Sequence, residues 1–253
     1  MHKPFKAIII GATSGIGREV AIHLSRHGVV LGLVGRRTEK LEALREELGA
    51  ERVHITELDV TRESAIDALD RLISAMGAPD LLLYASGIGK QNPELDINIE
   101  ANTVMTNAWG MVRIVDHFIN YVKREPSYNE KRPAHIAVIS SVAGTMGMGS
   151  APAYSATKSL QSCYLTALAQ HVRMEHIPAI FSDIRPGFVA TEILNPDKRY
   201  PMLMSADKAA RCILRGLRRR RRIIIFDWRF RLLVALWHMI PRWLWERMTI
   251  VRN

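Results

Sequence analysis

Residues 6–17 read KAIIIGATSGIG, a short apolar run that leads directly into three closely spaced glycines. The run Lys6 to Ile10 is typical of a buried strand, and Val20, Ile22 and Leu24 continue the pattern as a helix. Between a strand and a helix, glycines let the backbone approach a pyrophosphate at the helix N-terminus. The stretch therefore predicts a dinucleotide-binding turn, with an ordinary strand-to-helix turn as the alternative.

The rest of the chain alternates apolar strands with helical patterns. We predict strands at 29–34, 52–58, 80–84, 134–139, 179–184 and 223–226, and helices at 39–48, 64–76, 103–122 and 154–174. This alternation indicates the α/β class, with a single doubly wound parallel sheet (Rossmann-like) and helices on both faces. Ligands of such sheets bind at the carboxyl ends of the strands. We expect this domain to span residues 1–226.

Composition bounds the class of protein further. A chain of 253 residues with 48% hydrophobic content can form one large domain with a full core. Cys163 and Cys212 lie far apart, and the first apolar run is too short for a signal peptide, so we expect a reducing, cytoplasmic setting. Cys163 is expected to pack in the core. The nine histidines show no metal-ligand spacing, so His23 and His27 are expected at the surface and no metal is predicted.

The positive charge is concentrated in the last part of the chain. Residues 208–253 carry 13 Lys or Arg against 2 Asp or Glu, whereas residues 1–207 carry 22 against 23. The basic, aromatic-rich C-terminal segment 227–253 also holds four of the five tryptophans. Residues 218–253 are expected to make peripheral contact with an anionic membrane, to pack on a partner subunit, or to do both. Nucleic acid is disfavoured, because the arginine run 218–222 lacks a recognition motif.

A constellation of polar residues predicts catalysis. Tyr154 and Lys158 are four residues apart on one predicted helix, so they share a face, and Ser141 lies thirteen positions before Tyr154. With the glycine spacing, these residues resemble the short-chain dehydrogenase/reductase family over roughly residues 5–226. The resemblance implies a catalytic tetrad of Asn107, Ser141, Tyr154 and Lys158. Ser140 is the alternative serine, but the spacing to Tyr154 favours Ser141.

The chemistry of carbonyl reduction explains these residue types. An alkoxide formed by hydride addition needs an acid, and free tyrosine, with a pKa of about 10, is a weak one. We expect the Lys158 cation, helped by the positive nicotinamide in the oxidised complex, to lower the pKa of Tyr154, and the Ser141 hydroxyl to hydrogen-bond the substrate oxygen. The family resemblance further implies that Lys158 binds the nicotinamide ribose and that Asn107 holds a water in a proton relay.

The expected cofactor is NADP(H). After the second strand the chain reads Gly35-Arg36-Arg37, without the acid that would accept the ribose hydroxyls of NAD, and a guanidinium there can bind a 2′-phosphate. Two solvated arginines are the alternative. The resemblance places Asp59 at the adenine, although Asp59 also suits a helix cap. The full predicted cofactor set is Gly11, Ser14, Gly15, Ile16, Gly17, Arg36, Arg37, Asp59, Val60, Gly87, Tyr154, Lys158, Pro186, Gly187, Val189 and Thr191.

The predicted reaction is reduction of a ketone to a secondary alcohol, or the reverse. The substrate lid is expected at about 188–207, with an apolar stretch at 202–204. An apolar lid and an interfacial tail favour a lipophilic ketone such as a 3-ketosphinganine-like, fatty-acyl or steroid substrate. The alternatives are a reductase of a soluble sugar, polyol or aldehyde, and a non-catalytic dinucleotide-binding regulator. The family resemblance also implies a homo-oligomer, a dimer or a tetramer.

Overall fold

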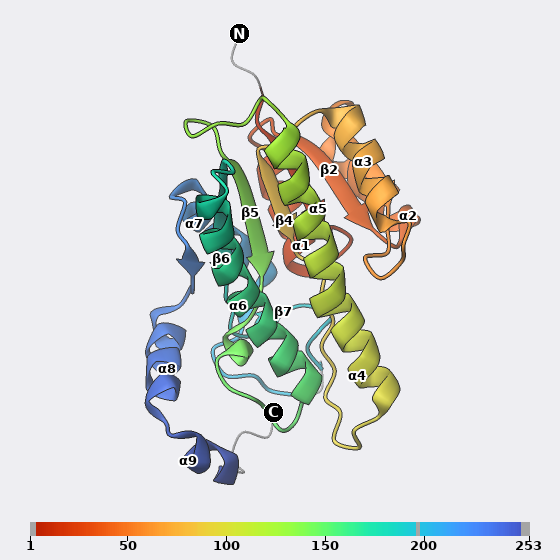
Figure 1. Cartoon of the computed structure of the whole chain (residues 1–253). Coiled ribbons are helices and arrows are strands. Elements are labelled where there is room, and N and C mark those ends of the chain that lie inside the picture. The colour runs from red at the N-terminus through yellow and green to blue at the C-terminus, as the bar shows by residue number, and fades with distance from the viewer. Residues whose placement is uncertain (1–3, 196–197, 249–253) are drawn as a thin grey trace.

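The computed structural model describes residues 4–195 and 198–248, and a seven-stranded sheet forms its centre (Figure 1). The strands lie in the order β3-β2-β1-β4-β5-β6-β9, and every neighbouring pair is parallel. Their bounds are β1 Lys6–Ile10, β2 Val30–Gly35, β3 Val53–Glu57, β4 Leu81–Tyr84, β5 Ala134–Ile139, β6 Ala179–Ile184 and β9 Ile223–Ile224. The predicted α/β, doubly wound parallel sheet is confirmed.

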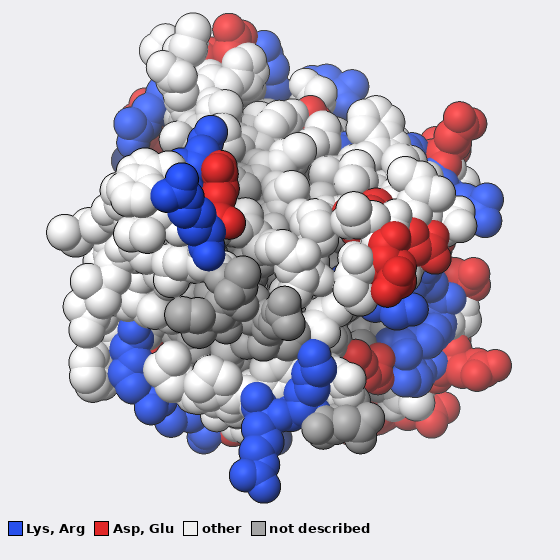
Figure 2. Space-filling view, turned by 90° about the horizontal axis from the view of Figure 1, so that it is seen from below, with Lys and Arg blue, Asp and Glu red and all other residues white. Residues whose placement is uncertain are grey.

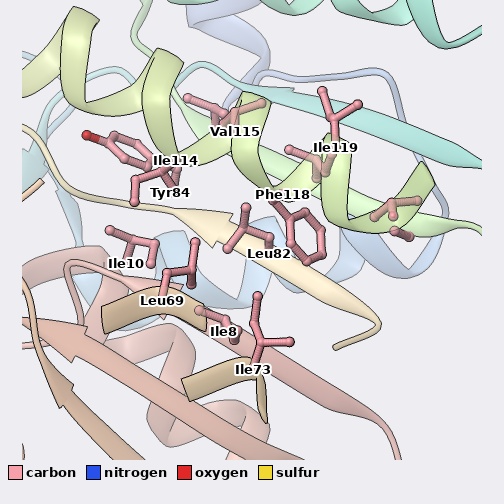
Figure 3. Packing of buried hydrophobic residues seen from close by; sticks show 14 of the residues in the cluster. Ile8, Ile10, Leu69, Ile73, Leu82, Tyr84, Ile114, Val115, Phe118 and Ile119 are labelled. Carbon is pink, nitrogen blue, oxygen red and sulfur yellow. The ribbon is translucent and has the colours of Figure 1, made fainter. Parts of the chain in front are cut away.

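Helices cover both faces of the sheet, and each face has its own apolar core. One core joins α3 (Ala65–Met76), α5 (Gly110–Arg124) and α6 (Pro152–Met174), and the other joins α1 (Gly15–Ser25), α2 (Thr38–Leu48) and α7 (Ala206–Arg218). Strand residues alternate between them: Ile8 and Ile10 face α3 and α5 (Figure 3), whereas Ala7 and Ile9 face the other side. Because both faces are buried, the strands are apolar throughout.

The sheet has one point where the strand order reverses. The chain runs from β1 outward to β2 and β3, and then returns to β4 on the other side of β1. The loops after β1 and β4 diverge there, which leaves a crevice at the carboxyl ends of the strands. The glycine turn and the residues after β4 both lie at this edge.

The helical elements before and around Asn107 differ from the prediction. The predicted helix 103–122 begins earlier, with α4 (Ile97–Val104), and passes through a π-helical turn, Met105–Trp109, into α5. Asn98 and Asn102 are weak helix formers, so the sequence pattern did not reveal α4. Tertiary contacts stabilise it instead: Asp96 caps Asn98 N at 2.8 Å, and Glu100 accepts from Ala153 N of α6 at 2.8 Å.

The predicted lid is anchored at both ends. The short strands β7 (Val189–Ala190) and β8 (Met204–Ser205) pair with each other in parallel, and α7 follows directly. Lys198 donates to Gln91 Oε1 at 2.7 Å, which ties the lid to the loop after β4. Residues 196 and 197 of the predicted lid lie outside the described residues. Two short 3-10 turns, Ala50–Arg52 and Val142–Gly144, complete the elements before the carboxyl-terminal segment.

The structure divides the basic tail into two parts (Figure 1). Residues 218–222 lie at the amino-terminal edge of the sheet, between α7 and β9, at the upper end of the view. The helices α8 (Trp228–Met239) and α9 (Arg242–Arg247) follow β9 and extend to the lower end, beyond the carboxyl edge. No helix within 4–195 or 198–248 is long and apolar enough to cross a bilayer. Residues 249–253 of the predicted tail segment lie outside the described residues.

The predictions for Cys163 and His23 were wrong. Cys163 is exposed rather than part of the core, because it lies on the outward face of α6. His27 is exposed as expected, but His23 is half-buried and its Nε2 lies 2.8 Å from Asp207 Oδ1 on α7. Glu19, His23 and Asp207 bring ligand atoms within 4.8 Å of one another. Asp207 also pairs with Arg211 at 2.6 Å, so Asp207 joins α1 to α7 through a hydrogen bond to His23 and also neutralises a cation of α7.

Candidate active site

The glycine turn adopts a conformation that only glycine adopts readily. Gly11 and Gly15 have φ of +91° and +55°. A Cβ on Gly17 would lie 2.2 Å from the Gly11 carbonyl oxygen, so the helix packs tightly on the turn. The Ser14 side chain makes no cap hydrogen bond to α1, which leaves the first N–H groups of the helix without that partner. These donors, at the positive end of the helix dipole, fit a pyrophosphate.

A cleft of about 440 Å³ runs along the carboxyl edge of the sheet. Every residue of the predicted cofactor set lines it except Gly17, which packs beneath the turn. Ser141, Tyr154 and Lys158 line it as well, whereas Asn107 is fully buried behind them. The structure therefore brings together residues that are spread over 180 positions of sequence, from Gly11 to Thr191. The volume and the mixed polar and apolar lining are those of a small-molecule site.

Arg36 and Arg37 lie at one end of the cleft, after β2. Arg37 crosses the glycine turn and donates to Thr13 Oγ1 at 2.9 Å and to Ser14 Oγ at 3.0 Å. Glu192 from the lid lies 3.4 Å from Arg37 and 3.6 Å from Lys40. These pairs are exposed, so each contributes little to stability. They nevertheless show that this end of the cleft attracts an anionic oxygen.

Asp59 and Val60 form the wall beside these arginines. Asp59 Oδ1 accepts from Thr61 N at 2.9 Å and from Thr61 Oγ1 at 2.7 Å, which is a local turn at the end of β3. Burial alone would raise the pKa of Asp59, but the hydrogen bonds from Thr61 and the charge of Arg36 outweigh it and lower the pKa. Asp59 also lines the cleft, so it can stabilise this turn and still contact an adenine as predicted.

Lys158 is held at the floor of the cleft by groups from two elements. Its Nζ donates to the Ile139 carbonyl at the end of β5 at 2.9 Å and to Gln161 Oε1 at 3.1 Å. The same Nζ lies 5.8 Å from the centre of the Tyr154 ring. Tyr154 and Lys158 are one turn apart on α6, so the helix presents both to the cleft.

Asn107 occupies the π-helical turn between α4 and α5. Its Oδ1 accepts from Ile88 N at 2.8 Å and its Nδ2 donates to Ile88 O at 2.7 Å. Gln161 Nε2 donates to the Asn107 carbonyl at 2.7 Å, so Gln161 connects Asn107 to Lys158. Asn107 thus lies in a π-helical turn, a feature that often occurs at functional sites.

The structure separates the two adjacent serines. Ser140 Oγ donates to the buried Asp183 carboxylate and to Ile184 O, so its hydroxyl is engaged between β5 and β6. Ser141 Oγ accepts from Ala143 N at 3.1 Å and hydrogen-bonds the Tyr154 hydroxyl. Ser141, as the spacing predicts, is therefore the serine that faces Tyr154.

The pKa values of Tyr154 and Lys158 in the free protein are both shifted by burial. Burial raises the pKa of Tyr154 above its ordinary value, and the hydrogen bond from Ser141 opposes this only in part. Burial also lowers the pKa of Lys158 to about 7, although the nearby Asp183 carboxylate acts to raise it. The expected lowering of the tyrosine pKa is thus wrong for the free protein, because burial of the phenol outweighs the neighbouring groups. The tyrosine is protonated near neutral pH and can serve as an acid.

The far end of the cleft is formed by the segment after β6. Pro186, Gly187 and Val189 line it, and the Thr191 methyl group would lie 3.2 Å from a Cβ on Gly15. Gly87 faces them from the loop after β4, where a Cβ would lie 3.4 Å from both Asn107 Oδ1 and Lys158 Nζ. This end can therefore hold a flat ring beside Tyr154, with backbone on both sides.

Some residues of the site were not predicted. A Cβ on Gly89 would lie 2.7 Å from the Tyr154 ring, so this glycine lets the loop after β4 pack against the phenol. Gln161 continues the spacing of Tyr154 and Lys158 by three residues, and that helical pattern was available in the sequence. The ring of Phe230 fills the space beside Gly187, where a Cβ would approach within 2.1 Å. No local pattern connects α8 with residue 187, so the sequence held no signal for it.

Comparison with known proteins decides the family. The short chain dehydrogenase family model matches residues 6–200. The chain belongs to the short-chain dehydrogenase family. It is therefore placed among oxidoreductases that act on CH–OH or C=O groups.

Individual short-chain dehydrogenase relatives agree over nearly the whole chain. An uncharacterized oxidoreductase of Myxococcus xanthus is 29% identical and covers 95% of this chain and 94% of its own length. A Burkholderia phymatum short-chain dehydrogenase in complex with NAD has a TM-score of 0.79 at 22% identity, covering 92% of each chain. A Sphingobium yanoikuyae short-chain dehydrogenase in complex with NADPH has a TM-score of 0.76 at 20% identity, covering 98% of each chain. At these identities, the two structures establish the fold alone.

Proposed function

We propose that the chain is an NADP(H)-dependent reductase that converts a lipophilic ketone into a secondary alcohol, or catalyses the reverse reaction. The observation that carries the proposal is the placement of Tyr154, Ser141 and Lys158 on one cleft with the glycine turn. The fit of the cofactor rests on the open N-terminus of α1 and on the cleft beside it. A nicotinamide dinucleotide bound there would supply the hydride.

In this proposal each residue of the tetrad has a separate task. Tyr154 donates its hydroxyl proton to the oxygen of the reduced carbonyl and accepts it again in the oxidation direction. Ser141 Oγ hydrogen-bonds the same oxygen and stabilises charge as it develops. Lys158, anchored to Ile139 O, would hold the nicotinamide ribose and, when protonated, places a positive charge near the phenol. Asn107, tied to Ile88 and Gln161, keeps the π-helical turn in place for a water that relays protons.

The preference for NADP(H) is supported by Arg36 and Arg37. Both side chains line the cleft after β2, and no carboxylate occupies the position that would accept the ribose hydroxyls of NAD. The position of Glu192, whose carboxylate lies against Arg37 and Lys40, supports binding of an anionic oxygen here. A 2′-phosphate would take up this charge with several hydrogen bonds.

A lipophilic substrate is supported by the apolar wall around Tyr154. Ile88, Ile193 and Leu194 line the cleft, and Ile193 lies beside Gly89, which contacts the Tyr154 ring. The lid also carries an exposed apolar side chain, Leu203. A lipophilic ketone would reach the cleft most directly if the enzyme made peripheral contact with a membrane.

We also propose that the chain forms a homo-oligomer through α4 and the helices beside it. Ile97, Val104, Met105 and Trp109 are exposed along α4 and the π-helical turn, and Leu160 is exposed on the neighbouring α6. Exposed apolar side chains in such number on adjoining helices are typical of a subunit contact. A light-scattering mass equal to one copy of the chain would contradict this proposal.

The function is tested by measuring NADPH oxidation with two sets of carbonyl compounds. One set holds a 3-ketosphinganine-like ketone, a fatty-acyl ketone and a steroid ketone in mixed micelles, and the other holds soluble sugars and aldehydes. We expect turnover with at least one micellar ketone and little with the soluble set. Turnover confined to the soluble set would replace the lipophilic substrate by a soluble one. Tight NADPH binding without any turnover would favour a dinucleotide-binding regulator.

The pKa of Lys158 predicts how NADPH binding depends on pH. Because burial lowers this pKa to about 7, the ammonium is charged below that pH and loses its proton above it in the free protein. We expect the dissociation constant for NADPH, measured by fluorescence, to rise by up to about tenfold per pH unit above pH 7. Lys158→Arg keeps its charge throughout this range, so its dissociation constant should stay flat there. A flat profile for the unmodified protein between pH 6 and 9 would show that the lysine does not control binding.

A further inference from the structure

Helix α8 has an apolar face on each side. Phe230 and Val234 point inward and are buried with Val142, which directly follows Ser141. On the opposite side, Trp228 is 72% exposed, Leu232 54%, Leu236 50% and Met239 78%. A helix that buries one apolar face and exposes a second has an unpartnered surface in the single chain.

The exposed residues of α8 form one continuous stripe. Their spacing of four, four and three residues places them on one face of the helix. Arg229 and Arg231 follow in sequence after Trp228 and Phe230, at helical positions on either side of this stripe. The short helix α9 adds exposed Trp243 and Leu244. We name these six side chains the outer apolar surface: Trp228, Leu232, Leu236, Met239, Trp243 and Leu244.

We propose that the outer apolar surface docks the enzyme on an anionic phospholipid bilayer. This proposal rests on the proposed function in one respect: docking would deliver a lipophilic ketone to the cleft. Tryptophan and leucine side chains enter the interface between headgroups and acyl chains, and arginines beside them meet lipid phosphates. The helices would lie in the plane of the membrane surface.

The charge of this region favours lipid over a second copy of the chain. Among residues 227–248, the four arginines Arg229, Arg231, Arg242 and Arg247 outnumber two acids, Glu246 and Asp227, and Asp227 pairs with Arg229. Two copies meeting here would bring these cations together, whereas an anionic bilayer complements them. Figure 2 looks at the lower end of the molecule, and its left part, where α8 and α9 lie in Figure 1, is largely uncharged, with a few basic and acidic side chains. This distribution is that of an interfacial surface rather than a polybasic one.

The same helices contact both loops beside the cleft. Phe230 packs against Gly187 and meets the Phe188 ring at 6.2 Å, in the segment after β6. Trp245 Nε1 donates to the Gly147 carbonyl at 2.7 Å, in the loop between Ser141 and Tyr154. Docking through α8 and α9 would therefore place the loops of the cleft next to the lipid.

The arginine run at 218–222 does not belong to this surface. Arg219 and Arg221 are exposed, but they lie at the amino-terminal edge of the sheet, away from α9 (Figure 1). This separation supplies a charge-matched control. Arg219→Gln/Arg221→Gln and Arg242→Gln/Arg247→Gln remove the same charge from opposite ends of the molecule.

The test is co-sedimentation of the full chain with vesicles of phosphatidylcholine and phosphatidylserine. Leu232→Glu/Leu236→Glu should weaken binding at least about tenfold, because two leucines no longer enter the interface. Arg242→Gln/Arg247→Gln should weaken it about tenfold, and Arg219→Gln/Arg221→Gln should leave it nearly unchanged. Met174→Glu, at an apolar residue that is also exposed but lies at the end of α6, is the control for the leucine variant.

Each outcome decides the proposal separately from the proposed function. Absence of vesicle binding by the unmodified chain overturns the docking surface and leaves carbonyl reduction untouched. An equal loss in both arginine variants also overturns it, because binding would then follow total charge. A lower light-scattering mass for Leu232→Glu/Leu236→Glu, without any change in vesicle binding, would assign the surface to a second copy. Docking is supported if Leu232→Glu/Leu236→Glu loses vesicle binding but keeps its NADPH affinity or its turnover of a soluble carbonyl. This result would support docking even if the substrate is not lipophilic.

Discussion

Tyr154→Phe is expected to lower kcat by at least about a thousandfold, because general acid catalysis contributes up to about four orders of magnitude and the Tyr154 hydroxyl is the proton donor that meets Ser141 in the cleft. The change removes only the hydroxyl. Its ring would still pack against Gly89, and the anchors of Lys158 at Ile139 and Gln161 do not involve it. NADPH affinity should therefore stay within a few-fold of the unmodified protein. The measurement is steady-state turnover together with fluorescence titration of NADPH.

Tyr121→Phe is the matched control for this variant. It removes the same group from α5, where the hydroxyl donates to Glu125 at 3.3 Å outside the cleft. We expect unchanged kcat. Substantial turnover by Tyr154→Phe would show that another group supplies the proton, and a Tyr154 variant without any functional consequence in the cell would favour a non-catalytic regulator.

Arg36→Asp is expected to raise the KM for NADPH about a hundredfold while changing the KM for NADH much less. Hydrogen bonds to a charged phosphate contribute about 1.5–3 kcal/mol, and the new carboxylate would repel the 2′-phosphate in addition. For NADH the same carboxylate can accept from the ribose hydroxyls. The ratio of kcat/KM for the two cofactors is the quantity to measure.

Arg26→Asp is the control for Arg36→Asp, because it makes the same change of charge at a different position. Arg26 is exposed at the end of α1 and does not line the cleft. We expect its cofactor ratio to match that of the unmodified protein. An equal rise of KM for both cofactors in Arg36→Asp would contradict a 2′-phosphate site and reduce Arg36 and Arg37 to solvated surface residues.

The sheet and most of the cleft could be predicted because their signals are local. Buried parallel strands are apolar throughout, and the glycine turn, the Tyr154–Lys158 spacing and the segment after β6 each sit directly beside a strand or on one helix. The site then follows from topology, because all carboxyl ends of parallel strands meet at one edge. Helix α7 was not predicted, although Ala209, Ile213 and Leu217 recur at helical spacing. Because the segment carries many cations, it was interpreted as part of the basic tail.

Features that depend on tertiary structure could not be read from the sequence. The arginine run and α8 are separated by only a few residues, yet β9 carries the chain from one edge of the sheet to the other between them. The predicted strand 223–226 ends at Ile224, where its pairing with β6 ends, and Asp227 then turns the chain with a φ of +76°. Likewise, the direction of the Tyr154 pKa shift depends on burial by loops far away in sequence.

The central claim is that the tetrad transfers hydride from NADPH to a carbonyl with Tyr154 as the acid. It is tested most directly with NADPH deuterated at nicotinamide C4, using whichever ketone gives turnover, and by locating the deuterium in the product. The account predicts one deuterium at the former carbonyl carbon for one of the two C4 stereoisomers of the cofactor, and no labelled product with Tyr154→Phe. Product that carries no deuterium from either stereoisomer, or labelled product formed equally well by Tyr154→Phe, would contradict it.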